Sequence, residues 1–116
     1  MKRAKLPLLI TPFGELELTN AIALRLFRKE LSVSQMNAAH ALIRKDLEDG
    51  VLMVNALPAK AFDRAKQIAR RQTPRLGTRT LDVLHVASAL VLQADTFYSF
   101  NARQGKLAAA EGLLVP

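Results

Sequence analysis

The blocks of apolar and polar residues along the chain predict short buried strands separated by longer helices. The strand candidates are brief apolar or aromatic runs bounded by Pro, Gly or polar residues, as is typical of strands in parallel sheets. They cover residues 6–11, 51–55 and 95–100, with a terminal edge strand at 113–115. Strands and helices in this order predict an α/β fold with a mainly parallel sheet, built as a single domain over residues 1–116.

Five helices are expected between and after these strands, from apolar residues at helical spacing and from start and stop signals. They cover residues 15–30, 35–49, 58–71, 78–90 and 102–111. In the first of them, Leu16, Ile22 and Leu26 are expected to face the core.

Capping and helix-breaking residues set the expected boundaries. Residues 13–14 are expected to form a turn before the first helix. Ser32 or Ser34 can cap the second helix, which Gly50 ends. Residues 72–77 contain Pro and Gly and are expected to form a loop.

The helix over residues 78–90 is expected to be the centre of the fold. It opens on a Thr cap, carries Asp82 in its first turn and is then almost entirely apolar or small, which predicts burial. An acid in the first turn of a buried helix is either a partner of the helix dipole or a ligand in a site. His85 lies on the same face and could act as a base, but a hydrogen-bonded core histidine is the commoner role.

Charge and composition narrow the possible functions. The net charge is +7, and one stretch holds seven basic residues but a single acid, Asp63. Those basic residues are Lys60, Arg64, Lys66, Arg70, Arg71, Arg75 and Arg79. The stretch favours RNA, DNA or an acidic partner protein, with a solvated helix face as the alternative. No apolar run approaches the roughly 18 residues of a membrane span, and the absence of Cys excludes disulfides, so we expect a cytoplasmic protein without membrane contact.

Three polar residues lie where parallel α/β folds form their sites. Glu17 follows the first predicted strand, Asp82 opens the central helix, and Asn101 ends the third strand. Oxygen ligands gathered there would bind a hard cation such as Mg²⁺ or Mn²⁺, which could activate water for phosphodiester cleavage. Taken singly, Glu17 or Asp82 is more often a first-turn acid favoured by the helix dipole.

Several segments resemble a known family in their residues and their order. The runs LDVLHVASA at 81–89, FYSFNARQ at 97–104 and AAAEGL at 108–113 are similar to the C-terminal half of PIN domains, and especially to the VapC-type toxins. The run ITPFGELELTNA at 10–21 resembles the family's segment with its second acid. The resemblance implies a three-layer α/β/α sandwich, a divalent-metal-dependent endoribonuclease, dimerisation and an antitoxin partner.

The resemblance also assigns residues. Glu17 and Asp82 match two of the family's acidic ligands, and Asn101 stands where a third is usually Asp, so these three form the expected catalytic and metal-binding set for Mg²⁺ or Mn²⁺. The family's first acid lies on a central N-terminal strand that has no counterpart here. The chain is therefore expected to be truncated relative to the family, with exposed strand edges and apolar helix faces.

Two functions follow from this resemblance. The first is an endoribonuclease of a toxin–antitoxin pair, with activity weakened because only two carboxylates remain to hold the cation. The second is a catalytically inactive binding module that pairs with an antitoxin or another subunit, as a homodimer or higher oligomer. A basic nucleic-acid binder without cleavage ranks behind both. Residues that could hold RNA phosphates are Arg70, Arg71, Arg75, Arg79 and Arg103.

Overall fold

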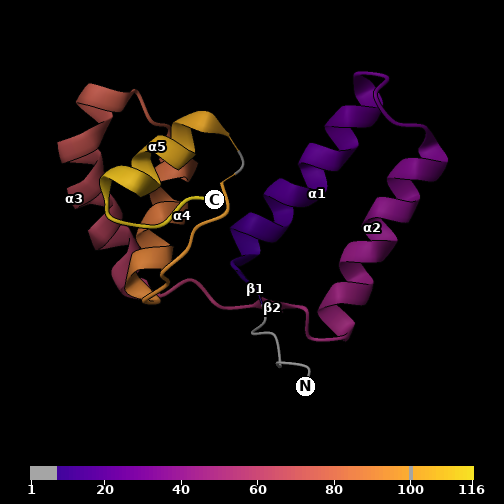
Figure 1. Cartoon of the computed structure of the whole chain (residues 1–116), viewed down its shortest axis with the longest axis horizontal. Coiled ribbons are helices and arrows are strands. Elements are labelled where there is room, and N and C mark those ends of the chain that lie inside the picture. The colour runs from indigo at the N-terminus through magenta and orange to yellow at the C-terminus, as the bar shows by residue number, and fades with distance from the viewer. Residues whose placement is uncertain (1–7, 100) are drawn as a thin grey trace. The chain divides into compact units, whose positions relative to one another are not determined.

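The computed structural model describes residues 8–99 and 101–116, which form five helices and two short strands (Figure 1). The chain divides into two compact units, Met1–Ala56 (unit 1) and Leu57–Pro116 (unit 2). The expected α/β/α sandwich with a mainly parallel sheet is wrong, because helices dominate the described residues and their only sheet has two strands. Each of those strands is three residues long, too little to carry a layer of helices on both faces.

Unit 1 is a pair of helices inserted between two parallel strands. Its elements are β1 (Leu8–Ile10), α1 (Pro12–Phe27), α2 (Val33–Glu48) and β2 (Leu52–Val54). The register pairs Leu8 with Leu52 and Ile10 with Val54, so α1 and α2 form the crossover that parallel strands require. The strand predictions at 6–11 and 51–55 are confirmed in their described cores, while residues 6 and 7 lie outside the described residues.

The start of α1 differs from the expected turn. Thr11 is the N-cap, and its hydroxyl accepts a hydrogen bond from the Gly14 amide at 3.0 Å. Pro12 stands at the first helical position, where its missing N–H costs nothing. A Cβ on Gly14 would lie 2.8 Å from Cγ1 of Ile10, so this glycine lets the helix approach β1 closely. The Phe13–Gly14 pair therefore starts the helix instead of preceding it.

The structure selects Ser32 over Ser34 as the cap of α2. The Ser32 hydroxyl accepts from the Gln35 amide at 3.1 Å, and the Gln35 side chain accepts from the Ser32 amide at 2.8 Å. This reciprocal capping box fixes the first turn of the helix. Gly50, at a φ of 77°, follows the other end of α2, as predicted.

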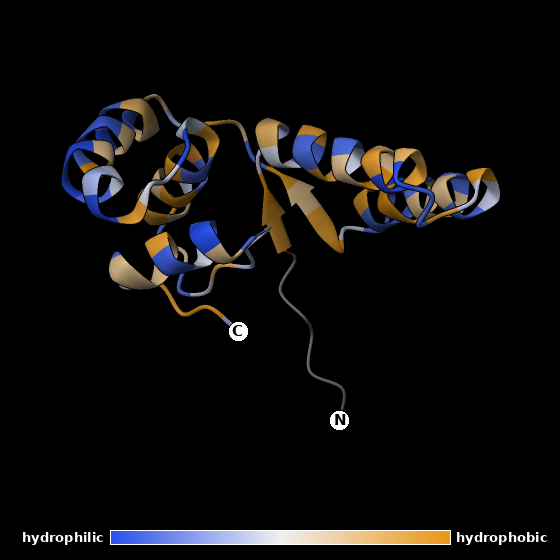
Figure 2. Cartoon of the chain, turned by 90° about the horizontal axis from the view of Figure 1, so that it is seen from above, coloured by the Kyte–Doolittle hydropathy of each residue, from blue (hydrophilic) through white to orange (hydrophobic). Residues whose placement is uncertain are grey.

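The apolar side chains of unit 1 are poorly covered. Figure 2 shows both strands in the orange of hydrophobic residues, yet no hydrophobic residue in the described part of unit 1 is buried. Ile22 and Leu26 are half-buried, but Leu16, which was predicted to face the core, is 65% exposed. The apolar residues of α1 have the expected helical spacing, but only some of them are shielded from solvent.

Unit 2 holds the hydrophobic core. Its helices are α3 (Ala59–Leu76), α4 (Thr80–Val91) and α5 (Ala102–Ala110). The buried cluster comes from all three helices and the C-terminal segment: Ile68, Val83, Val86, Ala87, Leu107, Ala108 and Leu113. The prediction that the central helix is buried is confirmed, since every residue of α4 from Asp82 to Ser88 is buried.

The predicted loop at residues 72–77 is wrong, because α3 continues through Pro74 to Leu76. A proline near a helix end removes only one amide donor, which the flanking turns can tolerate. The helix ends where Gly77 adopts the left-handed conformation at a φ of 63° and donates its amide to the Thr73 carbonyl. Gly77, and not Pro74, is therefore the stop signal.

The third and fourth predicted strands are wrong as sheet strands. The described part of this region forms one parallel bridge between Thr96 and Leu114, and Phe100 lies outside the described residues. Phe97 packs against the core of unit 2, so the aromatic pattern reflects helix packing and not a place in a wider sheet.

No helix in the described residues combines the length and the apolar character needed to cross a membrane.

Candidate functional site

Asp82 lies at the start of α4 and is 4% exposed. The expected Thr cap is wrong, because Arg79 is the N-cap and its backbone amide donates to Oδ2 of Asp82 at 3.1 Å. The Thr78 hydroxyl instead forms a hydrogen bond with the Thr73 hydroxyl at 2.7 Å. Asp82 therefore serves as the acidic partner of the helix N-terminus, one of the two roles that its position allows.

Asn101 lies beside Asp82 and caps the next helix. Its Oδ1 accepts the Gln104 amide at 2.8 Å, which makes Asn101 the N-cap of α5. Its Nδ2 then points to Oδ1 of Asp82, at 3.5 Å. The carbonyl oxygen that could bind a metal is thus committed to the helix cap, and the amide group turns its donor side toward the carboxylate.

Arg103 completes this cluster from the first turn of α5. Its Nε donates to Oδ2 of Asp82 at 3.0 Å, and the carboxylate in this ion pair is almost entirely buried. Burial by itself raises the pKa of Asp82, but the hydrogen bonds from Arg79, Arg103 and Asn101 and the charge of Arg103 lower that pKa below its ordinary value. Asp82 is therefore an anion at neutral pH whose charge is balanced within unit 2.

This arrangement does not fit a divalent cation in unit 2. A hard cation needs several oxygen ligands, and here the carboxylate faces a guanidinium and an amide NH₂ group. Over the described residues of each unit, no group of three His, Asp or Glu side chains gathers in a way that could hold a metal. The roles of Glu17, Asp82 and Asn101 as metal ligands stay a prediction from the family resemblance.

The structure brings Asp82, Asn101 and Arg103 together in unit 2. Glu17 lies in unit 1, where it is half-buried on α1. His85 is buried on α4, one turn after Asp82, as expected of a histidine in the core. Arg103, a candidate phosphate ligand, forms an ion pair with Asp82 beside it, and its role toward RNA stays a prediction.

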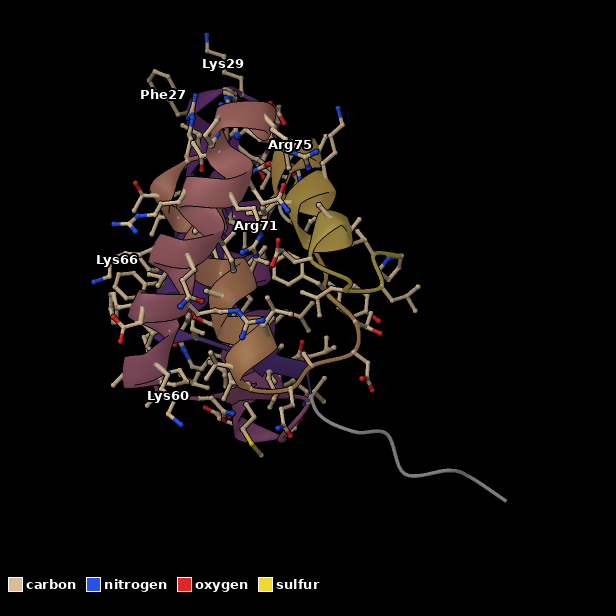
Figure 3. The ribbon with its side chains drawn as sticks, turned by 90° about the vertical axis from the view of Figure 1, so that its left-hand side faces the viewer. Phe27, Lys29, Lys60, Lys66, Arg71 and Arg75 are labelled. Carbon is tan, nitrogen blue, oxygen red and sulfur yellow. The ribbon has the colours of Figure 1, made fainter. Side chains whose placement is uncertain are left out.

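Six of the seven residues of the expected basic stretch are exposed on α3, and the seventh, Arg79, is the N-cap of α4. Figure 3 shows Lys60, Lys66, Arg71 and Arg75 along this helix, and the residues at helical spacing 60, 64, 71 and 75 share one side. Arg70 and Arg79 are also exposed. Lys66 forms an exposed ion pair with the sole acid of α3, Asp63, at 3.4 Å.

Glu111 is a partner of this basic face that the sequence did not reveal. It accepts from Nη2 of Arg71 at 2.7 Å and from Nε2 of Gln72 at 2.8 Å. Burial alone raises the pKa of Glu111, but the hydrogen bonds from Arg71 and Gln72 and the charges of Arg71 and Arg64 lower it overall. Arg75 donates to Gln72 at 2.7 Å, so the network ties the C-terminal end of unit 2 to α3.

Unit 1 has an open hollow of about 320 Å³ between α1 and α2. Its lining residues are Glu15, Thr19, His40, Ile43, Arg44 and Leu47. His40 forms a hydrogen bond with the Thr19 carbonyl at 3.3 Å, which joins the two helices. The ionisable side chains that line the hollow are Glu15, Arg44 and His40. This set matches no known catalytic or metal-binding arrangement.

Comparisons of the chain with protein-family models, with curated proteins and with solved structures each found no match.

Proposed function

We propose that this chain is a binding module of PIN-domain descent that pairs with another protein chain, either an antitoxin or a further subunit, and does not cleave RNA. The observation that carries the proposal is the uneven burial of apolar residues. The buried hydrophobic residues of the described chain all lie in unit 2, whereas unit 1 exposes apolar residues on both strands and both helices.

Exposed apolar area on this scale favours a partner. Parallel strands are normally covered on both faces, yet Leu9 and Met53 on one face and Leu8 and Val54 on the other are all exposed. Each buried CH₂ group contributes roughly 0.8 kcal/mol, so a partner that covers these strands and helices gains substantial binding energy. The resemblance to VapC-type toxins adds the expectation of an antitoxin or a second subunit, in the cytoplasm.

The Asp82 cluster supports the non-catalytic form of the proposal. Metal-dependent phosphodiester cleavage needs anionic oxygens facing the cation, and Asp82 is instead paired with Arg103. A cation would have to displace Arg103 from the buried Asp82 carboxylate, and breaking such a buried ion pair is costly because it leaves a charge without its partner. The same cluster is explained fully as a device that joins the N-termini of α4 and α5.

The experiment combines metal binding, RNA cleavage and complex mass. We expect calorimetric titration with Mg²⁺ and Mn²⁺ to give no saturable binding, and RNA incubated with the chain to stay intact. We also expect the chain purified from its native source to have the mass of a defined complex. Metal-dependent cleavage that is lost in Glu17→Gln and Asp82→Asn, from a chain that stays monomeric, would contradict the proposal. The exposed Asp63→Asn serves as the matched control, because Asp63 lies outside the cluster.

A second candidate function is RNA binding without cleavage through the basic face of α3. The supporting observation is the row of exposed cations at 60, 64, 71 and 75, although Arg71 is partly balanced by Glu111. This function predicts weak affinity that falls steeply with salt. Arg64→Gln with Arg75→Gln should weaken RNA binding, while Lys45→Gln with Arg44→Gln on α2 should leave it unchanged. Equal losses in both pairs would indicate nonspecific attraction by net charge alone.

A further inference from the structure

The helix α1 carries an exposed apolar stripe on the side opposite to its half-buried residues Leu18 and Ile22. At about 3.6 residues per turn, the stripe's five positions project in nearly one direction. They are Phe13, Leu16, Asn20, Leu24 and Phe27. All five are exposed, and the most exposed of the apolar members is Phe27, at 82%. Figure 3 labels the Phe27 side chain.

The stripe reads the same from both of its ends. Its members are Phe, Leu, Asn, Leu and Phe, and their spacing from Phe13 to Phe27 is three, four, four and three residues. A surface that is symmetric in this way is self-complementary under a two-fold axis. If two copies of α1 pair in opposite directions about Asn20, Phe13 meets the Phe27 of the second copy and Leu16 meets its Leu24.

The charges of α1 favour the same antiparallel arrangement. Glu17 lies near the start of the helix, whereas Arg28 and Lys29 lie just after its end. Arg25 is already paired with Glu30, and Glu15 lines the hollow beside α2. Antiparallel pairing brings the acidic end of each copy next to the basic end of the other and opposes the two helix dipoles. Parallel pairing would place like charges together. Asn20 at the centre of the stripe is the kind of single polar residue that fixes the register of paired helices.

We propose that α1 is a self-association surface, and that two copies of this chain pair through antiparallel α1 helices with Asn20 at the two-fold axis. This inference rests on the proposed binding function, because it names a second copy as the partner chain. Two helices of 16 residues give an interface at the small end of the range for stable complexes. The dimer should therefore form reversibly, with a dissociation constant in the micromolar range.

The first test measures the mass of the full chain by sedimentation equilibrium over a concentration series. The wild type should change from monomer to dimer, and Leu16→Glu should raise the dissociation constant at least about a hundredfold, because each dimer loses two buried leucines. Leu42→Glu is the control, since Leu42 is similarly exposed on α2 but lies outside the stripe. A wild type that stays monomeric at all concentrations, or a dimer that both variants weaken equally, overturns the inference.

The second test determines the direction of pairing and uses milder substitutions. The chain has no cysteine, so a single introduced Cys reports only its own neighbourhood. Asn20→Cys at the axis should form an intermolecular disulfide under mild oxidation. Phe27→Cys should not, because antiparallel pairing about Asn20 separates the two Phe27 positions by about 21 Å, far beyond disulfide reach. Equal crosslinking of both variants indicates parallel or random contact and overturns the antiparallel pairing.

The two proposals fail in different ways. A monomeric chain that cleaves RNA with Mg²⁺ and loses this activity in Asp82→Asn contradicts the binding function and the α1 dimer together. A native complex that resists Leu16→Glu, or that contains a different protein seated elsewhere, overturns only the α1 dimer. Circular dichroism of each variant, with helical content equal to that of the wild type, ensures that a lost dimer is not a lost fold.

Discussion

The two units of this chain have similar lengths and opposite degrees of burial. Unit 2 buries Ile68, Val86 and Leu107 completely, and its helices surround one cluster. The described part of unit 1 buries only Thr11 and Gly14, although its strands and helices are rich in Leu, Ile and Val. The composition of a segment therefore does not say whether its apolar residues have found partners within the chain.

The difference teaches where each unit obtains its stability. Core burial is the dominant favourable term in folding, and unit 2 has it. Unit 1 instead relies on local devices: the Thr11 cap, the Ser32–Gln35 capping box and the hydrogen bond between His40 and Thr19. Such devices contribute about 1 kcal/mol each, too little to order two helices without further apolar burial. Unit 1 is thus the part of the chain with the least apolar burial to stabilise it.

The largest expected effect on stability comes from shortening a core side chain of unit 2, and an exposed side chain of unit 1 provides the comparison. Leu107→Ala should lower the free energy of unfolding by about 2–5 kcal/mol, because Leu107 is 0% exposed and leaves a cavity. Leu42→Ala, at 59% exposed, should stay within about 0.5 kcal/mol. Urea unfolding followed by circular dichroism measures both values. A loss for Leu42→Ala as large as that for Leu107→Ala would show that unit 1 has a core of its own.

Helices were the part of the fold that the sequence predicted well. Ser32 and Gly50 mark the ends of α2 through local chemistry, and the mostly apolar and small residues of α4 predict its burial. The predicted loop at 72–77 is wrong because Pro and Gly near a helix end are both common stop signals, and the sequence does not reveal which of them ends α3. Only Gly77 has a conformation that ends a helix, while Pro74 was absorbed near the end of α3.

The predictions of the sheet and of the site were less accurate for a different reason, since both depend on contacts between residues far apart in the sequence. Thr96 and Leu114 lie in segments with the composition of strands, but the two segments form only one bridge, between these two residues. Asp82 was correctly placed in the first turn of α4, but its partner Arg103 lies 21 residues away. Glu111 pairs with Arg71 at a separation of 40 residues, and nothing in the local pattern of either residue predicts this contact.

An intermediate effect is expected from Asp82, which joins two helices inside unit 2. Asp82→Asn should cost about 1.5–3 kcal/mol at neutral pH, because the charged hydrogen bonds at the carboxylate are lost. Asp63→Asn, in an exposed ion pair on α3, should change stability by less than about 1 kcal/mol. Equal effects would show that the buried cluster contributes no more than an ordinary surface pair. Thermal unfolding of both variants decides the point.

The pH dependence of the same variant has a definite sign. The folded pKa of Asp82 is lowered, so the unfolded chain binds more protons than the folded chain as the pH falls. The stabilisation is present above the unfolded pKa and disappears as the pH falls through the folded pKa. The wild type should therefore lose more stability than Asp82→Asn over this acidic range. Parallel curves for the two proteins would mean that Asp82 has the same pKa in both states.

The smallest expected change in stability comes from a substitution at the N-cap of α2 in unit 1. Ser32→Ala removes the hydroxyl that accepts the Gln35 amide and should weaken α2 by about 1 kcal/mol, whereas Ser34→Ala, which has no capping role in the structure, should change little. Hydrogen exchange by mass spectrometry locates the loss, since about 1 kcal/mol corresponds to roughly fivefold faster exchange. We expect the acceleration in residues 33–48 and unchanged exchange in α3, α4 and α5. The same acceleration in the helices of unit 2 would mean that both units open together, and the contrast in burial would then not be a contrast in stability.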